Sequence, residues 1–86
     1  MKIGVIGIII ERNKEVVGEV QTLLSDNADI ILGRMGIPDR ENGVSVISVI
    51  VKATNERISA LTGKLGRLKS VKVKSAVTDG LDVIEK

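Results

Sequence analysis

The sequence contains no cysteine, no histidine and no aromatic residue. Without cysteine, the chain forms no disulfide and offers no thiolate to a metal ion or to nucleophilic catalysis. Without histidine, it lacks the commonest nitrogen ligand for metals and the usual general base. Without Phe, Trp or Tyr, no side chain can stack on a nucleobase, a sugar or a flavin. We therefore expect no enzymatic activity, no cofactor and no metal ion.

Charge of either sign is also modest. The chain has 86 residues, with 13 Lys and Arg against 11 Asp and Glu, so the net charge is +2 at pH 7. This balance gives little support to a nucleic-acid partner. A hydrophobic content of 43% is enough for one small folded domain. We assign residues 1–77 to that domain and residues 78–86 to a C-terminal tail.

One apolar run, Ile3–Ile10, follows Lys2 in the manner of a signal peptide. The run is too short to span a bilayer, and charged residues follow it where a small-residue cleavage site would lie. A buried strand explains the run better. We therefore expect a cytoplasmic protein without a membrane partner.

The apolar pattern predicts four strands, at residues 3–10, 30–37, 44–51 and 71–77, and two helices. The helices begin after a cap at Asn13 and after a cap at Thr54 or Asn55. Asn42-Gly43 predicts a hairpin turn, because this pair accepts positive φ at both central positions. The order is the ferredoxin-like βαββαβ arrangement, an α+β fold whose four-stranded antiparallel sheet carries two helices on one face.

Two observations agree on the order of the strands. Right-handed crossovers place the first and third strands in the centre, and these two strands are apolar on both faces. The second strand reaches Pro38, which lacks a backbone donor, and the last strand carries Lys72 and Lys74. Both features are typical of strands at the edge of a sheet.

This fold leaves one face of the sheet without helices. Val, Ile and Met side chains there would form an apolar patch on the order of a few hundred Å², which monomers seldom expose. Covering the patch is worth several kcal/mol at about 25 cal/mol per Å². We therefore expect a homo-oligomer, a dimer or a tetramer, built through the open sheet face or the strand edges. The alternative is that the tail lies over this face.

A first candidate binding stretch spans residues 33–40. Gly33 and Gly36 interrupt a strand, and such glycines usually mark a bulge or the close approach of a backbone or a ligand. Arg34 and Arg40 could clamp a carboxylate or phosphate in a forked hydrogen bond. The structural alternative is a bend shaped by the glycines, with the arginines in surface or intersubunit ion pairs.

A second candidate stretch spans residues 63–68 of the second predicted helix. Gly63 and Gly66 each cost roughly 1 kcal/mol there relative to alanine. A closely packed helix, an anion over bare backbone, or a helix that ends at Gly66 would offset that cost. Lys64 and Arg67 also belong to a basic stretch without acidic residues, which continues with Lys69, Lys72 and Lys74. This stretch is either a solvated face or a contact for an anionic ligand or nucleic acid.

The loop after the first strand, Ile10–Lys14, is a third place to consider. Acylphosphatases, which share this fold type, cradle phosphate there in a glycine-rich loop with an arginine. Here the loop has no glycine, and Glu11 beside Arg12 would repel an anion. We therefore assign the loop no ligand-binding residue.

Four segments together resemble one small family. They are Gly33–Pro38 (GRMGIP), the strand Gly43–Val51, Ile58–Leu68 (ISALTGKLGRL) and Val71–Lys74, and the resemblance covers nearly all of residues 2–77. The family consists of proteins of about this length, described as regulators of an iron-only hydrogenase system. The resemblance implies a ferredoxin-like fold of the ACT kind. ACT domains are regulatory modules that pair through their sheets and often bind amino acids or other small ligands between subunits.

We therefore predict a small oligomeric ACT-like module that regulates another protein by sensing a small anionic ligand. The candidate ligand-binding residues are Arg34, Gly36, Arg40, Gly63, Lys64, Gly66 and Arg67. The alternative is a DNA-binding transcriptional regulator that acts through the basic stretch 64–74, whose binding would weaken steeply with salt.

Overall fold

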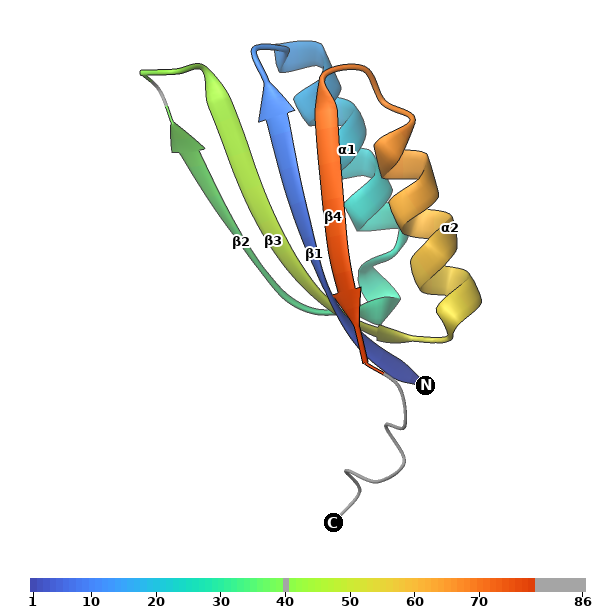
Figure 1. Cartoon of the computed structure of the whole chain (residues 1–86). Helices are drawn as coiled ribbons and strands as arrows, with labels where there is room; N and C mark the ends of the chain where they lie inside the picture. The colour runs from blue at the N-terminus through green and yellow to red at the C-terminus, as the bar shows by residue number, and fades with distance from the viewer. Residues whose placement is uncertain (40, 79–86) are drawn as a thin grey trace.

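The computed structural model describes residues 1–39 and 41–78. Its elements are β1 (Lys2–Glu11), α1 (Lys14–Asp26), the short 3₁₀ helix η1 (Ala28–Ile30), β2 (Ile31–Asp39), β3 (Val44–Ala53), α2 (Asn55–Gly66) and β4 (Val71–Val77) (Figure 1). The predicted ferredoxin-like order is confirmed. The sequence pattern did not indicate η1, which turns the chain from α1 into β2.

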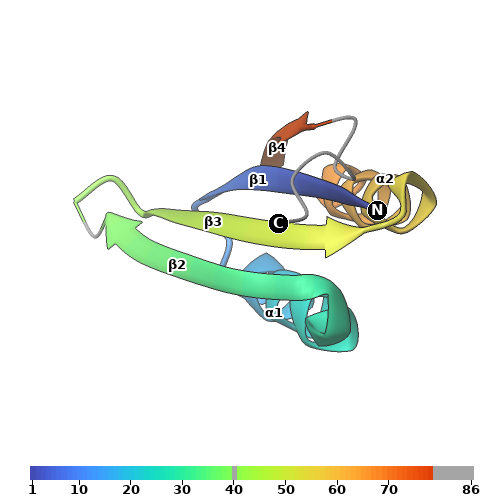
Figure 2. The same ribbon diagram turned by 90° about the horizontal axis from the view of Figure 1, so that it is seen from below.

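The sheet has four antiparallel strands in the order β2-β3-β1-β4. The predicted central strands and edge strands are therefore confirmed. Both helices lie on one side of the sheet (Figure 1), with α1 on the side of β2 (Figure 2). The opposite side of the sheet carries no helix.

Each helix begins where a side chain satisfies its first backbone donors. The Asn13 side-chain oxygen accepts a hydrogen bond from the Val16 N–H at 3.2 Å, and the Thr54 hydroxyl oxygen accepts one from the Arg57 N–H at 3.2 Å. The cap of α1 is thus the predicted one, and of the two candidates for α2 it is Thr54. The helix α2 ends at Gly66, and Arg67 follows as its C-terminal cap.

One core lies between the helices and the sheet. The inner stripes of α1 and α2 contribute three buried residues each, and the helix-facing side chains of β1 and β3 contribute most of the others. The buried set is Ile6, Ile8, Ile10, Val16, Val20, Leu24, Ile30, Ile47, Val49, Val51, Ala53, Ile58, Leu61 and Leu65. Val17 of α1 is only partly buried against this core.

The strand β2 is irregular at its start and long at its end. Its pairing with β3 shifts between Ile31 and Gly33, so Leu32 is the extra residue of a β-bulge. Pairing then continues through Pro38 to Asp39, two residues beyond the predicted end. A bulge beside Gly33 is one of the two interpretations that the glycines of this strand allowed.

The tip of the β2–β3 hairpin is tied to the loop that follows β1. Gly43 has φ of 68°, and its carbonyl oxygen accepts a hydrogen bond from the Arg12 N–H at 2.8 Å. Asn42, for which a positive φ was also expected, is not among the described residues with positive φ. The pairing Asp39↔Val44 leaves four residues, 40–43, between the strands. That connection is longer than the predicted two-residue turn. Of Asn42 and Gly43, only Gly43 adopts the left-handed conformation.

At the C-terminal end, the Thr78 N–H donates a hydrogen bond to the Ile3 carbonyl oxygen at 2.9 Å. Contact with β1 therefore extends one residue past the predicted domain boundary at residue 77. The rest of the predicted tail, residues 79–86, lies outside the described residues. The alternative prediction, that the tail covers the open side of the sheet, therefore concerns residues that the structure does not describe.

Candidate functional site

The face of the sheet opposite the helices, called the open face below, is apolar at its centre. Met35 and Ile37 of β2 have exposed fractions of 65% and 60%, and four aliphatic side chains of β1 and β3 are exposed by 40–45%. Pairing places them in rows across the sheet, with Ile50 beside Val5 and Val46 beside both Ile9 and Ile37. The six residues that define the open face are Val5, Ile9, Met35, Ile37, Val46 and Ile50.

The open face is hollowed near one edge and bordered by charge. Gly33 and Ser48 leave a depression of 260 Å³ beside Met35 and Ile50. At the β4 side, Lys72 Nζ lies 3.1 Å from Glu11 Oε1. An apolar centre inside a charged rim is the usual composition of a protein–protein interface.

The first predicted stretch lies on β2, at one edge of the sheet. Arg34 pairs with Val49 and therefore faces the helices, where its Nη2 donates a hydrogen bond to Gln21 Oε1 of α1. Gly36 pairs with Ile47 on the same side, and a Cβ atom at Gly36 would lie 3.9 Å from Ile47 Cγ1. Arg40 lies outside the described residues.

The second predicted stretch lies on α2, which packs chiefly against β4 at the other edge of the sheet. Gly63, Lys64 and Gly66 belong to the last part of the helix, and Arg67 caps it. A Cβ atom at Gly63 or Gly66 would meet nothing within 4 Å apart from its own helix. Within one chain, this stretch and the Arg34 stretch lie at opposite edges of the sheet and do not form one site.

The basic stretch 64–74 does not form a single face either. Lys64 belongs to α2, on the helical side of the sheet, whereas Lys72 and Lys74 pair with Ile9 and Gly7 on the open face. Lys72 is also engaged by Glu11. The positive charges are therefore divided between the two sides of the sheet.

A groove that the sequence analysis did not predict lies between α1 and the β2–β3 hairpin, and we call it the hairpin groove. At the start of α1 it encloses 410 Å³, and an adjoining hollow of 170 Å³ continues past Gln21 and Gly36. The two hollows share the lining residues Val17, Pro38 and Ser45. The larger volume lies within the range of small-molecule sites.

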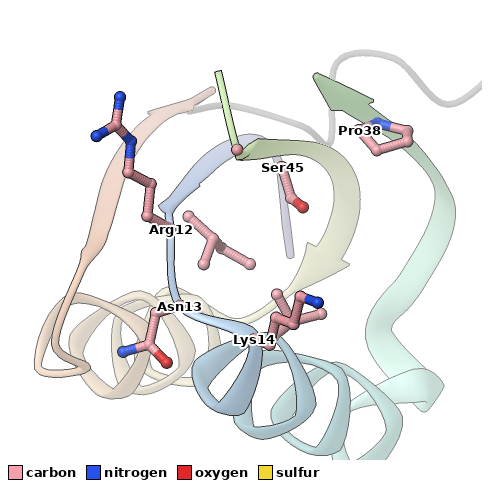
Figure 3. A pocket seen from close by; sticks show the side chains of 8 residues that line it. Arg12, Asn13, Lys14, Pro38 and Ser45 are labelled. Carbon is pink, nitrogen blue, oxygen red and sulfur yellow. The ribbon is translucent and has the colours of Figure 1, made fainter. Parts of the chain in front are cut away.

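The polar groups around the hairpin groove point in different directions. Lys14 and Ser45 direct their polar ends toward the space between α1 and β2, whereas the Arg12 guanidinium and the Asn13 amide point away from it (Figure 3). Arg12 Nε instead donates a hydrogen bond to the Asn42 carbonyl oxygen at 3.3 Å. Lys14 is therefore the cation that the groove presents at this end.

Glu11 does not oppose an anion in this groove. It pairs in register with Val44, on the side of the open face, and its carboxylate contacts Lys72 there. The expectation that Glu11 would repel a ligand near the loop after β1 came from its sequence neighbours. Because successive side chains of a strand point to opposite faces, Glu11 and Ile10 serve different surfaces.

Comparison with known proteins shows the family of the chain. Residues 2–75 match the family model described as "TM1266-like: Iron-only hydrogenase system regulator, putative". The chain belongs to this family. The structure of the uncharacterized protein TM1266 from Thermotoga maritima superimposes with a TM-score of 0.87 at 32% identity, covering 92% of this chain and 100% of that one. The family resemblance and the ferredoxin-like fold predicted from the sequence are thus confirmed.

Other comparisons add the fold alone. A formyltetrahydrofolate deformylase from Pseudomonas putida KT2440 matches with a TM-score of 0.61 at 11% identity, over 86% of this chain and 28% of that one. No curated protein matches the chain.

Two further observations describe this TM1266-like chain. Its described residues contain no group of three or more Asp or Glu side chains placed to hold a metal ion. Within residues 1–39 and 41–78, no helix has the length and apolar character to cross a membrane.

Two carboxylates of the TM1266-like chain are held by neighbours. Hydrogen bonds from Arg57 to Asp29, at 2.9 and 3.0 Å, lower the pKa of Asp29 and raise that of Arg57. At the hairpin tip, a hydrogen bond from the Asn42 side chain lowers the pKa of Asp39. Asp29 thereby connects η1 to the first turn of α2. Asp39 accepts hydrogen bonds from Asn42 within the hairpin turn.

Proposed function

We propose that this TM1266-like protein is a regulatory module that works as a homo-oligomer and responds to a small anionic ligand, in the manner of ACT domains. The family is described as a regulator of an iron-only hydrogenase system, and the proposal assigns the chain no catalytic step. The observation that carries the proposal is the open face, where six aliphatic side chains remain 40–65% exposed.

The energy available from covering the open face supports a second copy as its occupant. Fully burying one such side chain is worth about 1.5–3 kcal/mol, so burying the half that is still exposed is worth about 1 kcal/mol. Six side chains on each of two copies then contribute about 12 kcal/mol. Association itself costs about 4–15 kcal/mol, so the burial is sufficient for a stable pair over most of that range.

Charge at the ends of the open face also suits a second copy. At the hairpin end Asp39 pairs with Val44, and the neighbouring Glu11 already contacts Lys72, whereas Lys52 pairs with Ile3 at the opposite end. A two-fold axis that crosses the strands would place the Lys52 end of one copy over the acidic end of the other. Such self-complementarity is what a symmetric dimer requires.

The proposed ligand site uses two of the predicted residues. Gly36 lines the smaller hollow of the hairpin groove, and Arg34 donates a hydrogen bond to Gln21, which lines the same hollow. Gly63, Lys64, Gly66 and Arg67 lie on α2 at the other edge of the sheet, on its helical side, so a copy that pairs through the open face would not bring them to this groove.

Light scattering on the purified chain tests the oligomer. The expected mass is a multiple of 9.2 kDa at micromolar concentration. Ile50→Lys removes about 1 kcal/mol of burial from each copy, so a pair should dissociate roughly thirtyfold more readily, and burial of the new charge adds to this effect.

Ser59→Lys is the matched control, because it adds the same charge on an exposed position of α2 and should leave the mass unchanged. A single-chain mass at every concentration of the unaltered protein would overturn the oligomer. Equal masses for the unaltered chain and Ile50→Lys would mean that copies meet elsewhere than on the open face.

A further inference from the structure

The hairpin groove has an apolar floor. Ile10 and Ile47 are buried core residues whose outer surfaces line it, and Val17 of α1 and Pro38 of β2 form its two sides. Lys14, Val17 and Gln21 are spaced i, i+3 and i+7, so one side of α1 faces the groove along its length. Seven residues of helix correspond to about 10 Å, which is long enough for an extended chain of several carbon atoms.

One end of the groove carries a cation. Lys14 directs its ammonium group toward the space beside Ser45 (Figure 3), and among the described residues it makes no ion pair. Beyond the other end, Arg34 lines neither hollow but donates a hydrogen bond to Gln21, a neutral partner that leaves the guanidinium charge uncompensated. A ligand in the groove therefore meets an ammonium group at one end and hydrocarbon along the rest.

Acidic side chains are missing from this lining. None of the described residues that line the two hollows is Asp or Glu. Glu11 and Asp39, the nearest acidic residues along β1 and β2, both pair with Val44 on the open side of the sheet. An ammonium group placed in the groove would thus lose water without gaining a negative partner. An α-amino acid fits such a site worse than the same molecule without its amino group.

We propose that the hairpin groove binds a small anion with an apolar body and no ammonium group, its anionic head held by Lys14. A carboxylate and a phosphate monoester share this chemistry. The inference rests on the ligand-sensing part of the proposed function. The groove lies on the helical side of the sheet, and Ile37 and Val46, which line its smaller hollow, also belong to the open face.

Gly36 offers a way to fill the groove without disturbing the fold. Its φ lies outside the left-handed region, and an added Cβ atom would make an ordinary contact with Ile47. Gly33 lies on the same strand with open space around its own Cβ position, but it pairs with Ile50 on the open face. Gly36→Val and Gly33→Val therefore add the same side chain to opposite sides of one strand.

Isothermal titration calorimetry with the full chain tests the inference, using hexanoate, hexyl phosphate, norleucine and acetate as probes. Norleucine differs from hexanoate by the amino group alone, and acetate lacks the apolar body. Hexanoate or hexyl phosphate should bind at least about tenfold more tightly than norleucine or acetate. Which of the two binds more tightly identifies the head group.

The variants locate the site. Gly36→Val should weaken the better probe at least about tenfold and Lys14→Met about fivefold, whereas Gly33→Val should leave its affinity within about twofold. Circular dichroism on the same samples checks that each variant is folded. Norleucine binding as tightly as hexanoate, or equal losses from both glycine variants, would overturn the inference.

Light scattering on the same samples separates this inference from the oligomer. An oligomer that binds none of the four probes refutes the groove ligand and leaves the assembly standing. A monomer whose hexanoate binding is weakened by Lys14→Met and Gly36→Val refutes the assembly and supports the groove ligand.

Discussion

Gly63→Ala is expected to stabilise the folded chain. Gly63 lies inside α2, its φ is outside the left-handed region, and a Cβ atom there would meet nothing within 4 Å. Neither the backbone nor the packing of the described chain therefore requires glycine at this position. Alanine restricts the unfolded chain more and suits the helix better, a difference of about 1 kcal/mol in the free energy of unfolding.

For a domain of this size, about 1 kcal/mol corresponds to a rise of roughly 4–8 °C in Tm. Urea unfolding followed by far-UV circular dichroism measures the same change as a higher midpoint with an unchanged slope. Gly66→Ala is the natural comparison, because Gly66 is the last residue of α2 and should give a smaller gain. Because association raises apparent stability, all variants are compared at one protein concentration and again in the Ile50→Lys background.

The opposite result would refute the reasoning. If Gly63→Ala lowers the Tm or the mass measured by light scattering, something outside the described chain occupies the space above Gly63. Copies would then meet through α2 as well as through the open face. A loss confined to ligand binding, with Tm raised, would place Gly63 at a ligand.

Two further predictions concern the ends of elements. Asn13→Ala removes the cap of α1 and should lower the free energy of unfolding by about 1 kcal/mol. Thr22→Ala on the exposed side of α1 is the control and should change it by less than about 0.5 kcal/mol. The midpoints of urea unfolding measure both changes. Arg57 holds the pKa of Asp29 below its ordinary 3.8, so the pair stabilises the fold above that pH and loses its contribution as the pH falls through the lowered pKa. The stability advantage over Asp29→Asn should therefore be present at pH 7 and disappear in acid, and a constant advantage across a pH series of Tm would contradict this origin.

The fold was predictable because several local patterns agree with one another. Alternation put Ile47, Val49 and Val51 on one face of β3 and Val46 and Ile50 on the other, and the structure buries the first set and exposes the second. Pro38 and the lysines of β4 marked the edges independently of that pattern. The open face was predictable because two helices on one side of a four-stranded sheet leave its other side uncovered.

The hairpin groove was not predictable in the same way. It depends on how far the β2–β3 hairpin extends past α1, and that distance is set by the bulge at Leu32 and by pairing that continues through Pro38. The one local signal was Val17 of α1, an apolar residue that is only partly buried against the core. The direction of Glu11 was not predictable from the loop sequence, because it depends on the face of β1 from which Glu11 contacts Lys72.

The candidate stretches illustrate a related limit. Glycines that interrupt an element predict a close approach, but the sequence does not tell which neighbour approaches. In the structure, the space beside Gly33, Gly63 and Gly66 is open, and Gly36 makes only an ordinary contact. Spacing along the chain also did not show that β2 and α2 belong to opposite edges of the sheet.

The strand β2 presents Met35 and Ile37 to one side of the sheet and Arg34, Gly36 and Pro38 to the other. Residues that would touch a neighbouring copy thus alternate, one peptide unit at a time, with residues that would touch a small molecule. A bound ligand that shifts β2 slightly would move the residues on both faces of the strand together. Ligand binding and association with a second copy would then be coupled without a long chain of contacts, because the backbone of β2 carries residues of both sites.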